Sequence, residues 1–184
     1  MTHEYPFLVR GAADAPFLAH VDGLIDENIA NFQPNGSHKR FWSFTDGGDS
    51  IIQRKKLELI EHFGIVNWIG DTHTHDFIGM IDEGGVIRPH TDPNLDGRLH
   101  VRINVIVRMP DSGCVPLLDD IPIDVGLGDA WLCFSGRCCH ATTPVSGTHS
   151  RSALSYGLQV EQSAIFPLLA TYLAWRSHAS MALR

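Results

Sequence analysis

The tripeptide His90-Thr91-Asp92 carries two metal-ligating side chains two residues apart, directly before Pro93. On a β-strand, residues i and i+2 point to the same face, so His90 and Asp92 can reach one ion together. Pro93 cannot donate to a strand ladder, and we expect it to end the strand and leave the pair at its mouth. A third ligand has to come from elsewhere in the chain, and His140 is the candidate.

Two histidines and one carboxylate on one face of an ion leave its other coordination positions open. Non-haem Fe(II) sites use this donor set for oxygen chemistry, with a bidentate cosubstrate and O2 in the open positions. The residues His90, Asp92 and His140 therefore predict an iron site, and they are also the candidate catalytic residues.

The spacing of this pair is weak evidence alone, because His20-Val21-Asp22 has the same pattern. This second tripeptide lies where apolar residues recur every three or four positions, which predicts an amphipathic helix. In a helix, residues i and i+2 diverge by about 200°, so His20 and Asp22 cannot chelate one ion.

Arg151 distinguishes the first pair from the second. His140 follows Asp92 by 48 residues, and Arg151 follows His140 by 11. The chain here resembles the Fe(II)/2-oxoglutarate-dependent oxygenases, which place a His-x-Asp pair, a distal histidine and then an arginine at similar distances. The resemblance covers about residues 77–160.

The resemblance implies a double-stranded β-helix, or jelly-roll, core that binds Fe(II), 2-oxoglutarate and O2. It implies that Arg151 pairs with the distal carboxylate of 2-oxoglutarate, and a planar guanidinium binds a carboxylate bidentately. Many family members have a serine two residues after this arginine. Here that position is Ala153, with Ser152 and Ser155 nearby, so the pattern does not say which hydroxyl assists Arg151.

A second polar pair, Arg102 and Asn104, shares one face of the strand predicted to continue through residues 105–107. The segment resembles the Arg-x-His strand of aspartyl/asparaginyl β-hydroxylase-like members, with Asn104 replacing the histidine. That likeness implies that the pair faces the pocket and contacts the carboxylates of 2-oxoglutarate, whereas an outward-facing polar strand is the alternative. Unlike those members, this chain retains an aspartate ligand, Asp92.

Two other groups of metal-ligating residues compete with this site. His73 and His75 resemble the His-x-His pair of TIM-barrel metal hydrolases, but that fold needs about 250 residues and alternating helices. We expect them at the rim of the pocket, near substrate, or simply exposed.

Cys133, Cys138 and Cys139 precede His140 and could indicate zinc. Adjacent cysteines chelate one ion poorly and no Cys-x-x-Cys pair is present, so core or near-site thiols are favoured.

Two helices are predicted in the first third of the chain. Apolar periodicity indicates one over residues 17–32, with Asp14 as its N-cap and Pro16 in its first turn. Another is expected from Ser50 to Phe63, and Gly64 ends it.

The stretch between these helices, residues 33–49, is polar with embedded aromatic residues. A loop this long is typical of a functional segment, and we expect a lid over the active site, with Trp42 and Phe44 packing on substrate. Filling of the core by these two side chains is the alternative.

From about residue 65 to 160, short apolar runs alternate with Gly, Pro, Asp and Asn, which predicts seven or eight strands. Helices and strands are segregated, which argues against a parallel α/β sheet. We therefore predict a mainly β fold with flanking helices. A helix over residues 165–180 is apolar on most sides, and either the core or a second subunit, in a homodimer, is expected to cover it.

Composition bounds the remaining possibilities. The 184 residues predict one domain over 1–184, and the formal charge of −7, with only three lysines, argues against a nucleic-acid partner. No apolar run approaches the roughly 20 residues that span a bilayer, and no signal peptide is apparent. The four clustered cysteines favour a reducing cytoplasm.

The resemblance to the Fe(II)/2-oxoglutarate-dependent oxygenases implies that this protein is a dioxygenase of that kind. It implies hydroxylation of an unactivated C–H bond with release of succinate and CO2, and we expect the substrate to be a small molecule, an amino-acid derivative or natural-product intermediate. Two alternatives stay open: a cupin-like metabolite-binding jelly roll without oxygenase activity, and a zinc hydrolase that uses His73 and His75.

Overall fold

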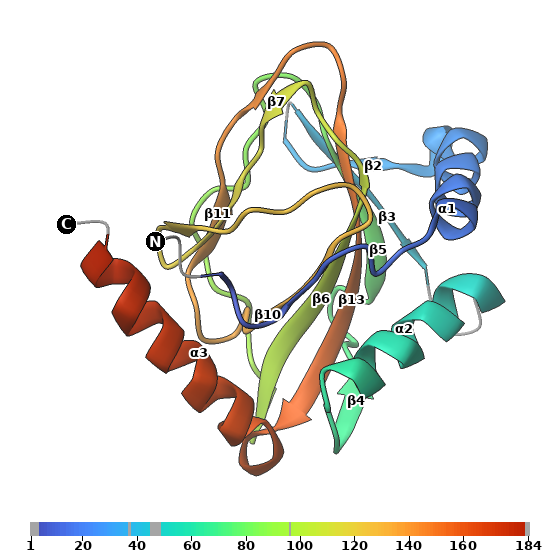
Figure 1. Cartoon of the computed structure of the whole chain (residues 1–184). Helices are drawn as coiled ribbons and strands as arrows, with labels where there is room; N and C mark the ends of the chain where they lie inside the picture. The colour runs from blue at the N-terminus through green and yellow to red at the C-terminus, as the bar shows by residue number, and fades with distance from the viewer. Residues whose placement is uncertain (1–3, 37, 45–48, 96, 183–184) are drawn as a thin grey trace.

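The computed structural model describes residues 4–36, 38–44, 49–95 and 97–182. A large antiparallel sheet has the strand order β1–β10–β6–β13–β5–β3–β2, and β4 also pairs with β13. Smaller strands form a second layer: β11–β8–β9 and β12–β7. Figure 1 shows β7 and β11 on the opposite side of the body from β5, β6 and β13, as in a jelly roll.

The strands of the large sheet are β1 Leu8–Val9, β2 Gln33–Pro34, β3 Lys39–Phe44, β4 Trp68–Gly70, β5 Asp76–Ile81, β6 Arg98–Arg108, β10 Ala130–Cys133 and β13 Arg151–Glu161. The smaller strands are β7 Ser112–Gly113, β8 Pro116–Leu118, β9 Ile121–Pro122, β11 His140–Thr142 and β12 Val145–Ser146. This mainly β core with flanking helices confirms the predicted fold class.

The two N-terminal helices begin where their capping residues predict. In α1 (Ala15–Glu27), the Asp14 carboxylate accepts a hydrogen bond from the Phe17 amide at 3.0 Å. In α2 (Ser50–His62), Asp49 caps the first turn in the same way, and Gly64 follows the helix with a φ of 65°. A short 3-10 helix, Ile29–Asn31, follows α1. Both helices lie on the side of β3 and β5 (Figure 1).

The second His-x-Asp tripeptide lies within α1, as predicted, and its two side chains have different partners. His20 Nε2 lies 2.7 Å from Asp49 Oδ2. Asp22 forms an ion pair with Arg108 on β6. They are therefore surface and helix-docking residues.

The prediction of a lid over residues 33–49 is wrong for the part that forms β2 and β3 (Ser37 and residues 45–48 lie outside the described residues). β3 pairs with β5, so its side chains alternate between two faces. Trp42 and Phe44 pack against the hydrophobic core, and Lys39, Phe41 and Ser43 line the internal cavity. The mixture of polar and aromatic residues in β3 resembled a loop because one strand face borders a cavity and the other the core.

The C-terminal helix α3 (Gln162–Ala182) is longer than predicted and is buried on one side only. Ile165, Tyr172 and Trp175 pack into the core, whereas Phe166 is 65% exposed and Met181 66% exposed. The core therefore covers one side of α3, and a homodimer through this helix stays a prediction. No helix in the described part of the chain is long and apolar enough to cross a membrane.

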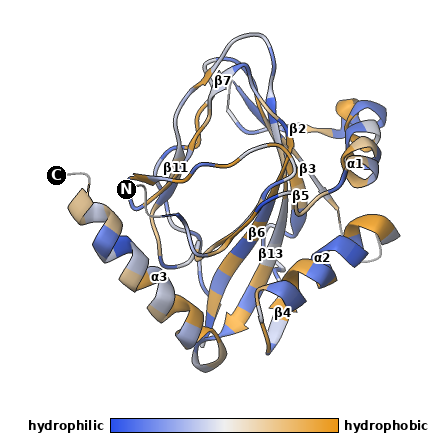
Figure 2. Cartoon of the chain, viewed as in Figure 1, coloured by the Kyte–Doolittle hydropathy of each residue, from blue (hydrophilic) through white to orange (hydrophobic). Residues whose placement is uncertain are grey.

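The two central strands are buried on both faces, but one face of each strand is apolar and the other is polar. Along β6 and β13, hydrophobic and hydrophilic residues alternate (Figure 2). Ile103 and Tyr156 point into the hydrophobic core, whereas Arg102, Asn104 and Ser155 face the cavity. A strand with one apolar and one polar buried face indicates that a polar site lies inside the fold.

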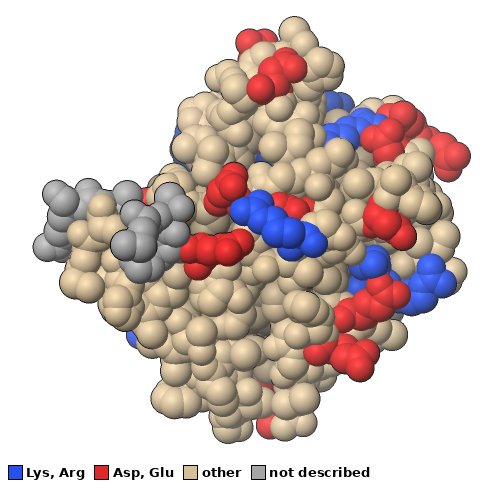
Figure 3. Space-filling view, viewed as in Figure 1, with Lys and Arg blue, Asp and Glu red and all other residues tan. Residues whose placement is uncertain are grey.

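Charged side chains are interspersed on the surface that Figure 3 shows, and acidic groups lie beside the basic ones. The chain carries 21 acidic against 14 basic residues. The predicted absence of a nucleic-acid partner stays a prediction, and this surface gives no reason to change it.

A buried ion pair fixes α2 to the sheet. Lys56 Nζ lies 2.8 Å from Asp76 Oδ2 and 3.0 Å from Oδ1, and both side chains are almost completely buried. Asp76 also accepts a hydrogen bond from the Gly157 amide at 3.0 Å, so the pair connects α2, β5 and β13.

We predict that Lys56→Met lowers the free energy of unfolding by about 3–5 kcal/mol, because it leaves the Asp76 carboxylate buried without its cation. Chemical denaturation measures this change. Arg54→Met on the exposed face of α2 is the matched control, and it should cost less than about 1 kcal/mol. Equal effects of the two substitutions would contradict this assignment.

Candidate metal centre

The structure brings His90, Asp92 and His140 together, as the sequence predicted. One donor atom from each residue lies within 4.8 Å of the other two. Asp92 Oδ1 is 3.6 Å from His90 Nε2 and 4.0 Å from His140 Nε2. The two imidazole rings are neighbours, with centroids 4.1 Å apart. Three donors that converge in this way fit a facial metal site.

Backbone hydrogen bonds set this arrangement. The His90 amide donates to the His140 carbonyl at 3.2 Å, and the His140 amide donates back to His90 at 2.9 Å. The Asp92 amide donates to the Ser135 carbonyl at 2.8 Å. The predicted strand through His90 is thus a single bridge in an otherwise irregular segment. The backbone of His90 is therefore placed by His140, the first residue of β11, and the backbone of Asp92 is placed by Ser135 in the preceding segment.

Each histidine presents the same nitrogen to the centre. His90 Nδ1 lies 2.8 Å from the Arg88 carbonyl, and His140 Nδ1 lies 3.5 Å from the Cys138 carbonyl. This assigns the proton to Nδ1 and leaves Nε2 free for an ion. Burial lowers the pKa of His140, which favours the neutral form that binds metals.

The Asp92 carboxylate is held from behind by two residues of β6. His100 Nδ1 lies 3.2 Å from Asp92 Oδ2, and Arg102 Nε lies 3.4 Å from the same oxygen. Burial alone would raise the pKa of Asp92, but the contact with His100 and the charge of Arg102 outweigh it, so the pKa lies well below its ordinary value. Oδ1 remains directed at the two histidines as an ionised ligand.

A second buried carboxylate, Asp71, completes this network. Its Oδ2 lies 3.2 Å from Arg102 Nη2 and 3.5 Å from His100 Nε2. Burial raises the pKa of Asp71, but the hydroxyl and amide of Thr74 and the charge of His100 lower it to about 2. Arg102 also donates to Ser155 Oγ at 3.2 Å. Arg102 faces the cavity as predicted, and two carboxylates engage its guanidinium.

Arg151, the first residue of β13, has a different environment. It is 5% exposed and lines the cavity, with its guanidinium over the Trp131 ring, 5.7 Å from the ring centroid. Among the described residues, no Asp or Glu oxygen lies within 4.0 Å of Arg151. Burial lowers the pKa of Arg151, which indicates a desolvated cation that an anionic ligand would stabilise.

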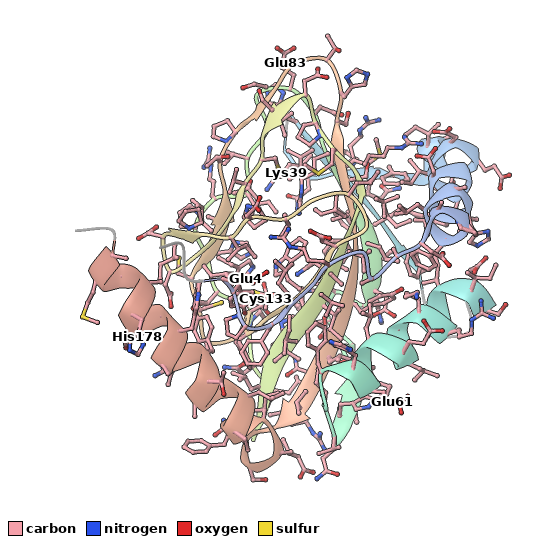
Figure 4. All side chains as sticks on the ribbon, viewed as in Figure 1. Glu4, Lys39, Glu61, Glu83, Cys133 and His178 are labelled. Carbon is pink, nitrogen blue, oxygen red and sulfur yellow. The ribbon has the colours of Figure 1, made fainter. Side chains whose placement is uncertain are left out.

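One cavity of about 420 Å³ lies between these groups, and His100 and Asp71 stand behind its wall. The three candidate metal ligands line this cavity, and so do Arg102, Asn104 and Arg151. Figure 4 shows Lys39 and Cys133, which also line it, between the layers of strands, whereas Glu61 and His178 lie on outer helices.

His73 and His75 lie at this cavity, which agrees with the rim position expected for them. They occupy a bend rather than a strand, and His75 has a φ of 55°. Within the described parts of the chain, neither belongs to a group of residues that could hold a metal. The groups that could are the His90, Asp92 and His140 triad, and Cys133 and Cys138 with His140.

His100 and Asp71 were not predicted from the sequence as residues of the metal centre. A local signal exists for the first: His100, Arg102 and Asn104 alternate along one strand face between buried apolar residues. Asp71 has no such signal, because its partners on β6 are distant in the sequence.

No protein-family model matches the chain, and no curated protein matches it. Solved structures do match. The viral collagen prolyl hydroxylase of Paramecium Bursaria Chlorella virus-1, in complex with 2-oxoglutarate, is 13% identical, with a TM-score of 0.64 over 83% of this chain and 94% of that chain. HygX of Streptomyces hygroscopicus, with nickel, 2-oxoglutarate and hygromycin B bound, is 12% identical, with a TM-score of 0.64 over 83% and 82%.

A third structure, the non-heme alpha ketoglutarate dependent epimerase SnoN from nogalamycin biosynthesis, is 14% identical, with a TM-score of 0.66 over 83% of this chain and 77% of that one. This chain has the fold of the Fe(II)/2-oxoglutarate oxygenases. The oxygenase fold confirms the predicted jelly-roll core. At these identities it assigns no role to any residue, so the roles rest on the geometry described above.

We predict that His90→Ala, made in a Cys133→Ser background that removes the second possible metal group, abolishes stoichiometric binding of Ni(II), used as a redox-stable probe, and that His20→Ala in the same background leaves it unchanged. The first removes a converging ligand, and the second removes the histidine of the helical tripeptide. A loss of more than about 100-fold in affinity is expected for His90→Ala, since supporting residues alone contribute about 10–100-fold. Isothermal titration calorimetry measures both, and equal affinities would refute the site.

Proposed function

We propose that this protein is an Fe(II)- and 2-oxoglutarate-dependent oxygenase. The observation that carries the proposal is the buried Arg151 guanidinium, which no carboxylate of the described residues neutralises. It shares one cavity with His90, Asp92 and His140. A buried cation near a metal triad suits a ligand that chelates the metal at one end and carries a carboxylate at the other.

The chain's own residues then have distinct tasks. His90, Asp92 and His140 would hold the iron, and the chemistry that iron and 2-oxoglutarate would supply is activation of O2 with conversion of 2-oxoglutarate to succinate and CO2. Arg151 binds the distal carboxylate of 2-oxoglutarate. His100 and Arg102 keep the Asp92 carboxylate oriented, because both contact its Oδ2.

We therefore replace the role predicted for Arg102, which was binding of 2-oxoglutarate. Its guanidinium is engaged by Asp71 and Asp92, so we assign it to positioning the metal ligand. Asn104 lines the cavity from the same face of β6 and stays the candidate contact for a 2-oxoglutarate carboxylate.

The missing serine two residues after Arg151 has no direct substitute on β13. Ala153 lines the cavity and has no hydroxyl, and Ser155 accepts a hydrogen bond from Arg102. Lys39 on β3 is a second cation near Arg151. Both residues lie opposite Ile81 of β5, Lys39 on one side of that strand and Arg151 on the other. Arg151 and Lys39 together give this end of the cavity a charge that suits the distal carboxylate.

For the substrate we propose a small molecule, with hydroxylation of a C–H bond as the reaction. The cavity of about 420 Å³ is within the usual range of small-ligand sites. Phe41 and Phe77, whose ring centroids are 6.3 Å apart, give it an apolar wall. The neighbour HygX was solved with hygromycin B, a small molecule, which supports the same class.

The two alternatives account for less of the site. A cupin-like binder of metabolites has no need for a buried, unneutralised Arg151. A zinc hydrolase based on His73 and His75 lacks a third ligand for these residues within the described ranges.

We predict that Arg151→Gln weakens 2-oxoglutarate binding to the Ni(II)-loaded protein by roughly 100-fold, because truncating one partner of a buried charge pair costs about 2–5 kcal/mol. Ni(II) binding itself should be unchanged. Arg137→Gln is the matched control, since Arg137 is exposed. Calorimetric titration with 2-oxoglutarate gives the affinities, and wild-type affinity in Arg151→Gln would remove the support for the cosubstrate.

Turnover tests the reaction class. With Fe(II), O2 and ascorbate, the wild-type protein should convert 2-oxoglutarate to succinate even without its substrate, and faster with a substrate from a panel of amino-acid derivatives and natural-product intermediates. Mass spectrometry quantifies succinate. Succinate formation no greater than that of His90→Ala, across the panel, would contradict the proposed activity.

A further inference from the structure

A pair of buried thiols lies beside the metal centre. Cys133 Sγ and Cys138 Sγ are 3.6 Å apart, and one donor atom from each thiol and from His140 lies within 4.8 Å of the others. We propose that Cys133, Cys138 and His140 form a second metal site, for a thiophilic ion such as Zn²⁺, which shares His140 with the iron triad and excludes iron when it is filled. This inference does not depend on the oxygenase activity.

A tight turn builds this cluster. Cys133 ends β10, and the chain then reverses, because the amides of Arg137 and Cys138 both donate to the Phe134 carbonyl at 2.8 Å. The reversal returns Cys138 to Cys133 and starts β11 at His140. Three soft or borderline ligands from one short segment therefore converge.

Zinc was disfavoured from the sequence because the adjacent residues Cys138 and Cys139 would chelate one ion poorly. In the structure these two cysteines do not act as a pair. Cys139 is part-exposed, and its amide donates to Asp119 Oδ1 at 2.9 Å. The partner of Cys138 is Cys133 instead, five residues earlier. Cys139 is therefore not part of the proposed zinc site.

The distances and donor types suit a tetrahedral ion. Two thiolates bound to one Zn²⁺ at about 2.3 Å each lie about 3.8 Å apart, close to the observed 3.6 Å. Sulfur donors select Zn²⁺ or Cu(I), whereas the carboxylate and imidazoles of the triad suit Fe(II). Cys133 lines the cavity, so an ion can enter from there and keep its fourth position toward that space.

His140 couples the two sites. Its Nδ1 is directed at the Cys138 carbonyl, which leaves Nε2, 4.0 Å from Asp92 Oδ1, as the donor. One nitrogen serves one ion at a time, so an ion held by the two thiols removes a ligand from the triad.

The first experiment uses Co²⁺ as the probe and the His90→Ala protein, which lacks the triad but keeps the thiols. One equivalent of Co²⁺ should produce an intense sulfur-to-cobalt charge-transfer band and the visible bands of tetrahedral Co²⁺. Adding Cys133→Ser or Cys138→Ser should abolish the charge-transfer band, and adding Cys139→Ser should preserve it. A missing band in His90→Ala, or a band that survives Cys133→Ser, would overturn the proposal.

A second measurement needs no variant. X-ray absorption at the zinc edge of the zinc-loaded wild-type protein should show sulfur in the first shell, whereas a shell of only nitrogen and oxygen would overturn the site.

Competition tests the shared ligand. Zn²⁺ should displace Fe(II) from wild-type protein at a concentration at least about tenfold lower than from Cys133→Ser, since the variant loses one of the soft donors that favour zinc. Equal concentrations would mean that zinc displaces iron at the triad itself, and exclusion through His140 would be wrong. Because the thiolate band is read in a protein without the triad, the cobalt result is separate from the success or failure of the proposed oxygenase activity.

Discussion

His100 and Arg102 approach one oxygen of Asp92 from the same face of β6, and this contact joins the metal centre to the central sheet. Asp92 lies in an irregular segment, where the hydrogen bond from its amide to the Ser135 carbonyl, at 2.8 Å, holds its backbone but not its carboxylate. Its orientation therefore depends on β6, whose register is fixed by β10 and β13. Asp71 contacts the same guanidinium, with its Oδ2 3.2 Å from Arg102 Nη2. If both Asp71 and Asp92 were lost, the buried guanidinium would lack compensation, at a cost of several kcal/mol.

The same constraint explains the composition of the central strands. β6 and β13 are covered on both faces, yet only one face of each is apolar. The other face lines the cavity. Each charged group on it must be neutralised either by another group of the protein or by a bound ligand. Arg102 belongs to the first kind, because two carboxylates engage it, and Arg151 belongs to the second. That difference between two buried arginines separates a residue that supports the fold of the site from one that we propose binds a ligand.

Local signals in the sequence were sufficient for some parts of this protein. Asp14 and Gly64 predicted helix ends because capping depends on neighbouring residues alone. The convergence of the three candidate metal ligands could be predicted because His-x-Asp is a local pattern with a distal His140. β3 was missed because its cavity face carries a cation, an aromatic ring and a hydroxyl in turn (Lys39, Phe41 and Ser43), so polarity does not alternate regularly along the strand. Asp71 acquires its role only through tertiary contacts with β6, so no pattern of spacing indicated it.

The spectrum of the anaerobic complex reports whether one cavity binds iron through the triad and 2-oxoglutarate through Arg151. Fe(II) and 2-oxoglutarate, added without O2, should give the wild-type protein the weak visible charge-transfer band of a chelated 2-oxo acid. His90→Ala, which removes a ligand, should show no band. A wild-type protein without the band, or a band of equal intensity in His90→Ala, would contradict the account.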